Sequence, residues 1–131
     1  MRYICLGYME ESRFESMSES ERDEFMDTSF AYDEEMQKSG HFRQGEALQS
    51  VHAATTVRLK GGKLSVTDGP FAETKEALGG ITILEAKNLD EAIQIMSKHP
   101  SVKFGGTWEI RPAADLAAMI AASRRRRFKS A

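Results

Sequence analysis

A short charged loop in the middle of the chain contains the side chains best suited to acid–base chemistry. Asp68 is followed by Gly69 and Pro70, and Glu73 and Lys75 come soon after. Glycine can adopt positive φ and proline fixes the exit direction, so this tripeptide predicts a tight turn in which the aspartate bonds the backbone two residues on. Two interpretations stay open: Asp68 only shapes this turn, or it is a rigidly held acceptor or base beside a ligand.

Charged side chains also gather on one face of a predicted sheet. On the last predicted strand, Trp108 and Ile110 share the face that we expect under the helices, because side chains alternate along a strand. Charges on the opposite face must be paired or must bind a ligand if a partner covers them. The alternative to a ligand site is an ion pair, Glu109 with Arg58 or Glu46 with Arg111, that fixes the register of a dimer. The residues expected on this helix-free face are Glu46, Arg58, Glu109 and Arg111.

The histidines and the single cysteine predict no metal site. His41, His52 and His99 have no metal-binding spacing, and one cysteine cannot complete a closed zinc site. We therefore expect neither a metal nor a cofactor. His99 stands just before Pro100 and is predicted to be a cation at a helix end. Cys5 lies on a predicted central strand and is expected to be a buried small hydrophobe rather than a nucleophile.

The segments that must position these residues follow from local patterns. Ser18 and Glu21 form a capping box that starts a helix, Gly40 is a natural stop, and Asn88 caps a second helix that Pro100 ends. Gly61 and Gly62 predict a two-residue hairpin turn. The expected strands are residues 2–8, 42–48, 54–60, 63–67, 80–85 and 106–112, with helices at 20–38 and from 88 to the proline.

Without the hairpin, the predicted order is β-α-β-β-α-β, the ferredoxin-like α+β arrangement. Both helices then cover one face of an antiparallel sheet, and the other face needs solvent, a ligand or a second copy. We therefore predict a homodimer.

Composition limits the remaining classes. The chain has 131 residues, a formal net charge of −2 and no apolar run long enough to span a membrane, so we expect one soluble cytoplasmic domain with no membrane partner and no nucleic acid. Residues 113–131 form a helix-prone tail whose basic segment, from Arg124 to Arg127, is expected to be solvated and disordered.

A family resemblance covers residues 1–112 and excludes the tail, and it is carried mainly by one long segment: Thr67-Asp68-Gly69-Pro70-Phe71-Ala72-Glu73-Thr74-Lys75-Glu76, followed by Gly79-Gly80. The chain resembles the DGPF-domain branch of the YCII-related family, and the resemblance implies a ferredoxin-like fold that dimerises as an α+β barrel. One branch of the wider family carries a proposed His–Asp pair on its first helix, which has no match at Arg22, Asp23, Glu24, Phe25 or Lys38 here.

The resulting hypothesis is a small-molecule site in the dimer cleft near Asp68, with Glu46, Arg58, Glu73, Lys75, Glu109 and Arg111 as ligand contacts and enzymatic activity left open. The alternative is a non-catalytic regulatory module, because some relatives are encoded near alternative sigma factors. A polar pocket converging on Asp68 favours the first, and a cleft filled by ion pairs favours the second.

Overall fold

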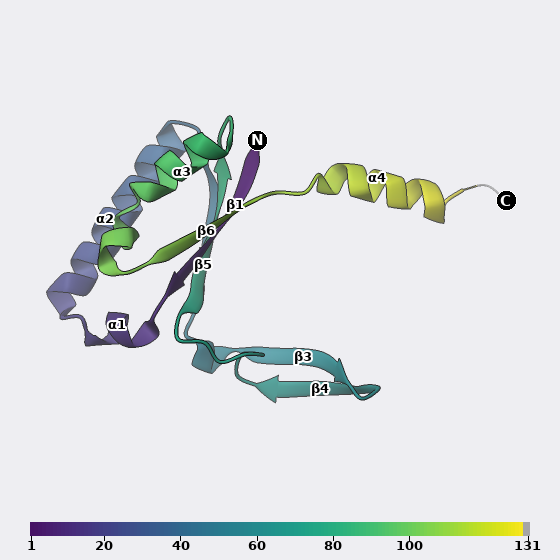
Figure 1. Cartoon of the computed structure of the whole chain (residues 1–131), viewed down its shortest axis with the longest axis horizontal. Helices are drawn as coiled ribbons and strands as arrows, with labels where there is room; N and C mark the ends of the chain where they lie inside the picture. Colours follow the sequence, from purple (N-terminus) through teal and green to yellow (C-terminus); the bar gives the residue numbers. More distant parts are fainter. Residues whose placement is uncertain (130–131) are drawn as a thin grey trace.

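A four-stranded antiparallel sheet forms the centre of the protein (Figure 1). The computed structural model describes residues 1–129. The sheet has the strand order β2-β5-β1-β6, with every neighbouring pair antiparallel. The strands are β1 (Arg2–Met9), β2 (Phe42–Ala47), β5 (Ala77–Glu85) and β6 (Thr107–Pro112). The predicted α+β class with antiparallel strands is confirmed.

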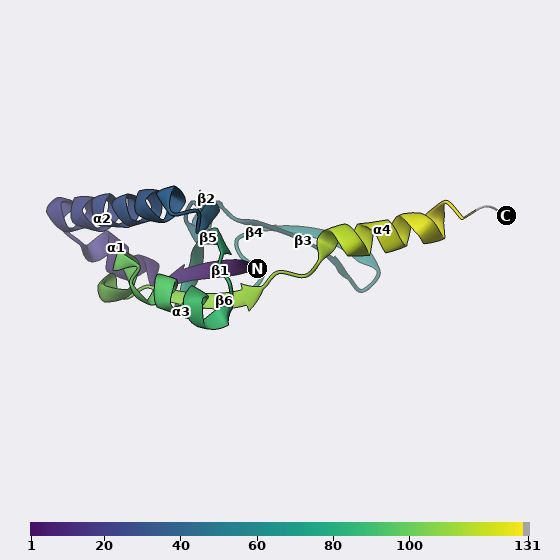
Figure 2. The same cartoon turned by 90° about the horizontal axis from the view of Figure 1, so that it is seen from above.

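The helices gather on one face of this sheet, as Figures 1 and 2 show. They are α1 (Glu11–Ser16), α2 (Glu19–Lys38) and α3 (Leu89–Ser97), with the short 3-10 turn η2 (Pro100–Phe104) after α3. A second 3-10 turn, η1 (Val51–Ala53), lies in the chain between β2 and the segment that follows it. The capping box at the start of α2 is confirmed, since the Glu21 amide donates to Ser18 Oγ at 3.1 Å and the Ser18 amide to Glu21 Oε1 at 3.2 Å. Helix α1 was not predicted, because six residues give no clear period.

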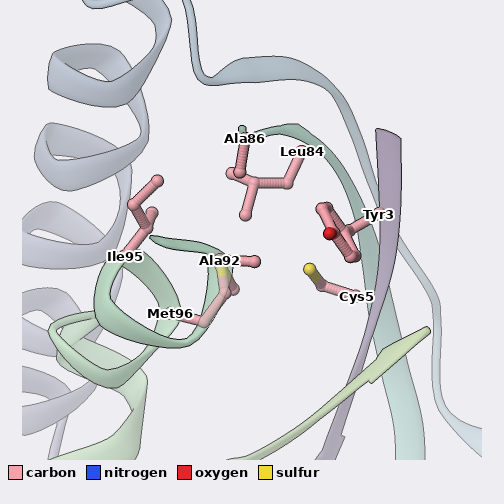
Figure 3. Packing of buried hydrophobic residues seen from close by; sticks show 7 residues of the cluster. All are labelled: Tyr3, Cys5, Leu84, Ala86, Ala92, Ile95 and Met96. Atoms are coloured by element: carbon pink, nitrogen blue, oxygen red, sulfur yellow. The ribbon is translucent and has the colours of Figure 1, made fainter. Parts of the chain in front are cut away.

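The core lies at one end of the sheet, between the strands and α3 (Figure 3). Tyr3 and Cys5 point from β1 toward Ala92 and Met96 of α3, and Leu84 joins them from β5. Trp108 and Ile110 of β6 pack against this cluster, so their predicted place under the helices is confirmed. By alternation along β1, Ile4 and Leu6 therefore face the other, helix-free side.

Two segments project away from the body on the side opposite α2 (Figures 1 and 2). The first is the predicted hairpin, β3 (Thr55–Lys60) and β4 (Lys63–Asp68), which forms a separate two-stranded sheet. Its turn residues Gly61 and Gly62 both have positive φ, 58° and 81°. The second is α4 (Leu116–Arg127). The four arginines expected to be disordered are exposed residues of this helix, and the last two residues of the predicted tail lie outside the described part.

Within residues 1–129, no helix combines the length and the apolar character that crossing a membrane requires.

Candidate functional site

A row of small residues crosses the sheet and leaves room under α2. The row consists of Ala47 on β2, Gly80 on β5 and Gly7 on β1, and Trp108 is the neighbour of Gly7 on β6. A Cβ atom on Gly7 would come within 3.0 Å of the Trp108 ring, so the indole lies directly on this glycine. The next rows toward α3 contain Cys5 and Tyr3, whose side chains belong to the hydrophobic core. Space therefore opens where the strands carry only glycine and alanine.

This space is a cavity of about 770 Å³ between the sheet and helices α1 and α2, called here the α2 cavity. A volume of this size is typical of small-molecule sites, roughly 300–1,000 Å³. T-shaped aromatic pairs hold the end of α2: Phe14 with Phe25 at 5.9 Å between ring centroids, and Phe25 with Phe104 at 5.2 Å. The aromatic residues that line the cavity are Tyr8, Phe14, Phe25, Phe30, Phe42 and Trp108.

A chain of hydrogen bonds forms one polar side of the α2 cavity. The Ser101 amide donates to Nδ1 of His99 at 3.2 Å, so this nitrogen carries no proton and His99 Nε2–H donates to Asp33 Oδ1 at 3.1 Å. The Ser101 hydroxyl lies 2.8 Å from the same Nδ1 and accepts from Trp108 Nε1 at 2.9 Å. The residue expected to be a cation at a helix end is thus a buried side chain bonded to Ser101 and Asp33. All four side chains line the cavity.

Asp33 also affects a neighbouring tyrosine on α2. The Tyr32 hydroxyl donates to the Ile95 carbonyl at 2.6 Å, and its ring meets the His99 ring edge-on at 5.5 Å between centroids. Burial first, and then the negative charges of Glu35 and Asp33, raise the pKa of Tyr32. Tyr32 therefore stays neutral, and its ring packs against the imidazole of His99.

Ser29 adds an unpaired polar atom to the cavity wall. Its side chain is buried, with 8% of the residue exposed, and within residues 1–129 its hydroxyl has no hydrogen-bond partner. Buried hydroxyls normally have partners, because desolvating one without compensation costs about 1–3 kcal/mol. Ser29 lies four residues before Asp33 on α2, so the two side chains share one helix face that looks onto the cavity.

The predicted Asp68 site lies elsewhere. Asp68 is an exposed residue at the end of β4 and does not line the α2 cavity. The turn itself is as expected, with Gly69 at a φ of 99°, but backbone and threonine groups hold it: the Gly69 amide donates to the Ala54 carbonyl at 2.7 Å, and the Thr56 hydroxyl to the Gly69 carbonyl at 2.8 Å. Within residues 1–129 the Asp68 carboxylate accepts no hydrogen bond, so the expected side-chain bond of the turn is absent.

The other predicted contacts do not converge in the described chain. Arg111 Nε donates to Glu109 Oε2 at 2.6 Å, so neither forms the expected pair with Glu46 or Arg58. This hydrogen bond and the charge of Glu109 raise the pKa of Arg111. Lys75 reaches Glu10 at 3.7 Å. Arg58 lies on β3 and Glu73 in the exposed loop after β4. Glu46 is exposed, and the register places it in one row with Ile81 and Leu6 on the helix-free face.

Sequence reasoning missed the Asp33–His99 pair because each residue has a common local role: one is an acid on a charged helix, the other precedes a proline. One sequence signal could have located the cavity: glycines occur inside the predicted strands. A glycine within a strand often marks a place where another backbone or a ligand comes close. Gly45 of β2, Gly80 of β5 and Gly7 of β1 lie on three adjacent strands, and all line the cavity.

The cysteine has the predicted role. Cys5 is fully buried, and burial raises the pKa of its thiol to about 11. In the part of the chain that the structure describes, no three His, Cys, Asp or Glu side chains are grouped as metal ligands would be.

This chain is similar to known proteins in both sequence and fold. The chain is 34% identical over 118 residues to an uncharacterised protein of Rhizobium meliloti (strain 1021), covering 87% of this chain and 93% of the relative. In structure it is similar to 5-chloro-2-hydroxyhydroquinone dehydrochlorinase of Burkholderia phenoliruptrix AC1100, solved in complex with 2,5-dihydroxybenzoquinone, with a TM-score of 0.53, 16% identity and coverage of 87% and 94% of the two chains. The family model of the YCII-related domain matches residues 1–117. The chain therefore belongs to the YCII-related domain family.

Proposed function

We propose that this protein binds a small organic molecule in the α2 cavity, with Asp33 as the main polar contact. The observation that carries this proposal is the coincidence of an aromatic-lined space of about 770 Å³ with an unpartnered buried hydroxyl and an oriented carboxylate. Such a combination of apolar walls and a few placed polar groups is typical of ligand sites. The similarity to an enzyme solved with a bound small molecule supports the same class of function.

His99 acts as a positioning residue for Asp33. The order of hydrogen bonds, from the Ser101 hydroxyl through His99 to Asp33, is that of a nucleophile, base and acid relay. Here, however, the Ser101 amide donates to the same Nδ1 and Trp108 donates to the Ser101 hydroxyl, so the imidazole is held by fixed bonds. If the ligand is turned over, the group placed to exchange a proton with it is the Asp33 carboxylate.

A thermal-shift screen against a metabolite library tests this proposal. A ligand at 100 times its dissociation constant stabilises the folded chain by about 2.7 kcal/mol. We expect Ser29→Ala to bind the screened ligand more weakly while the free protein keeps or gains stability, because the change removes an unsatisfied buried hydroxyl. Ser39→Ala, an exposed helix-end serine, is the matched control. A screen without hits, or hits that bind Ser29→Ala and Asp33→Asn as well as wild type, would contradict the proposal.

We also propose the homodimer, in which two helix-free sheet faces pack as an α+β barrel. On this face Ile4 pairs with Ile83 and Leu6 with Ile81, and the side chains are only partly buried within one chain. The projecting hairpin adds exposed leucine and valine side chains. An apolar face of this kind favours a partner of the same chemistry, and a second copy meets that need.

The Asp68 site remains a second proposal for that dimer. Asp68, Arg58 and the Glu109–Arg111 pair would meet there only if a partner chain brings them together. The non-catalytic module related to sigma factors would instead use exposed surfaces, such as the four arginines of α4. Nothing in the geometry favours this alternative over ligand binding.

A further inference from the structure

We infer that the α2 cavity takes an organic cation: a protonated amine carried on an aromatic or alkyl body. The inference rests on the proposed small-molecule function and narrows the class of its ligand. It follows from three independent features of the cavity, which are its charge, its aromatic walls and its unpaired hydroxyl.

The charges on the cavity wall are all negative. Among residues 1–129, no lysine or arginine lines the cavity. A ligand of opposite charge is attracted there and an anion is repelled, through the Coulomb interaction with these carboxylates. The carboxylates that line it from α1 and α2 are Glu11, Glu15, Asp33 and Glu34.

Nearby basic side chains do not neutralise this wall. Lys75 contacts Glu10, which does not line the cavity. The Arg13 side chain packs over Gly105, where a Cβ atom would lie 2.8 Å from its Cδ atom. Helix α2 itself carries eight acidic residues and two basic ones, so its field on the cavity side is negative.

The aromatic walls suit the same ligand. The face of an aromatic ring is electron-rich and attracts a cation within about 6 Å of its centre. Phe30 is 56% exposed and Phe14 half-buried, so both rings are accessible to a ligand entering the cavity. Trp108 lines the same cavity and provides the ring type that binds cations best.

The unpaired hydroxyl gives the cation a defined position. Ser29 Oγ and the carboxylate of Asp33 are two acceptors one helical turn apart, and His99 already fixes the orientation of the second. An ammonium group can donate to both at once, which would satisfy the serine and form a charge-assisted bond to the aspartate. A carboxylate ligand could not donate to Asp33.

Trp108 allows a direct test, because it is the single tryptophan of the chain and lines the cavity. Its fluorescence would be titrated with three probes of one shape and different charge: 4-phenylbutylamine, 4-phenylbutanol and 4-phenylbutyrate. We expect the amine to bind on the order of tenfold more tightly than the alcohol, and the carboxylate to bind most weakly. Raising the salt concentration should weaken the binding of the amine but not that of the other two probes.

Two matched variants locate the effect. Asp33→Asn should remove most of the preference for the amine, whereas Glu35→Gln, which changes the charge of α2 outside the cavity, should keep it. Equal binding of amine and alcohol, or tighter binding of the carboxylate, would overturn the inference. If none of the probes binds while the library screen yields neutral or anionic ligands that require Ser29, the ligand class is wrong and the proposed binding function stands.

Discussion

Nε2 of His99 lies 3.1 Å from Oδ1 of Asp33, although 66 residues separate them in the sequence. The contact joins the middle of α2 to the start of η2 and places a carboxylate of fixed orientation on the wall of a cavity. The wider family has a branch with a proposed His–Asp pair on one helix, and here the two residue types meet from different elements.

The His99 network should be a large source of stability. His99→Ala would remove two aromatic contacts and leave the Ser101 amide and hydroxyl without their acceptor. We expect a loss of about 2–4 kcal/mol in the free energy of unfolding, measured by urea denaturation. The matched control, His52→Ala, changes an exposed side chain. Its free energy of unfolding should stay within about 0.5 kcal/mol of the wild-type value. Equal effects of the two changes would show that the network contributes little.

Asp68 provides a test of the second site. Because its carboxylate makes no bond within residues 1–129, Asp68→Asn and Asp68→Ala should each change the stability of a single chain by less than about 0.5 kcal/mol. If Asp68 is an ionised ligand contact, Asp68→Asn should lower affinity for a screened ligand by about 1.5–3 kcal/mol in calorimetry. Unchanged affinity would show that Asp68 does not contact the ligand and that the loop only forms a turn.

The Cys5 thiol should be unreactive in the folded protein. With a pKa of about 11 against 9.0 for an ordinary thiol, its thiolate fraction at pH 8 is lower by about 100-fold. Alkylation by iodoacetamide should therefore be slow until urea unfolds the chain. Rapid alkylation without denaturant would show that β1 opens locally.

The same pKa shift predicts a pH dependence of stability. Below pH 9 the thiol is protonated in both states and contributes no slope. Between pH 9 and 11 the unfolded chain loses the proton first, so the free energy of unfolding should fall as pH rises. Cys5→Ala lacks this thiol, so its free energy of unfolding should fall less steeply over the same pH range. Urea denaturation at each pH measures both curves. Parallel curves would contradict the shift.

Removal of α4 should leave the body folded. The Ala113 amide donates to the Arg2 carbonyl, so a chain that ends after residue 114 keeps the last bond of the sheet edge. Helix α4 extends away from the body (Figure 2), and we expect a melting temperature within about 3 °C of the full chain. A larger loss that depends on protein concentration would place α4 in the dimer contact.

The hairpin should contribute to self-association. Leu59 and Leu64 are cross-strand partners, each 72% exposed. We expect a homodimer that buries on the order of 1,500 Å² in total, and replacement of both leucines by serine should weaken it at least about tenfold in sedimentation experiments. Replacement of the next pair, Lys60 and Lys63, by serine is the control. A wild-type monomer at micromolar concentration would remove the basis of the dimer and of the Asp68 site.

The sequence by itself determined the local elements, because each depends on residues close together in the chain. Ser18 and Glu21 start α2, Asn88 accepts from the Glu91 amide at the start of α3, and the paired glycines close the hairpin. Alternation along β6 also placed Trp108 under the helices, since the period of a strand is two.

Only the tertiary structure decided where the polar site lies. The α2 cavity exists because Ala47, Gly80 and Gly7 come into one row across three strands, and that row depends on the register of pairs far apart in sequence. The same packing brings His99 to Asp33 and leaves the Ser29 hydroxyl without a hydrogen-bond partner among residues 1–129. Neither a local propensity nor a short motif encodes these distances, because long-range contacts are set by how the elements pack together.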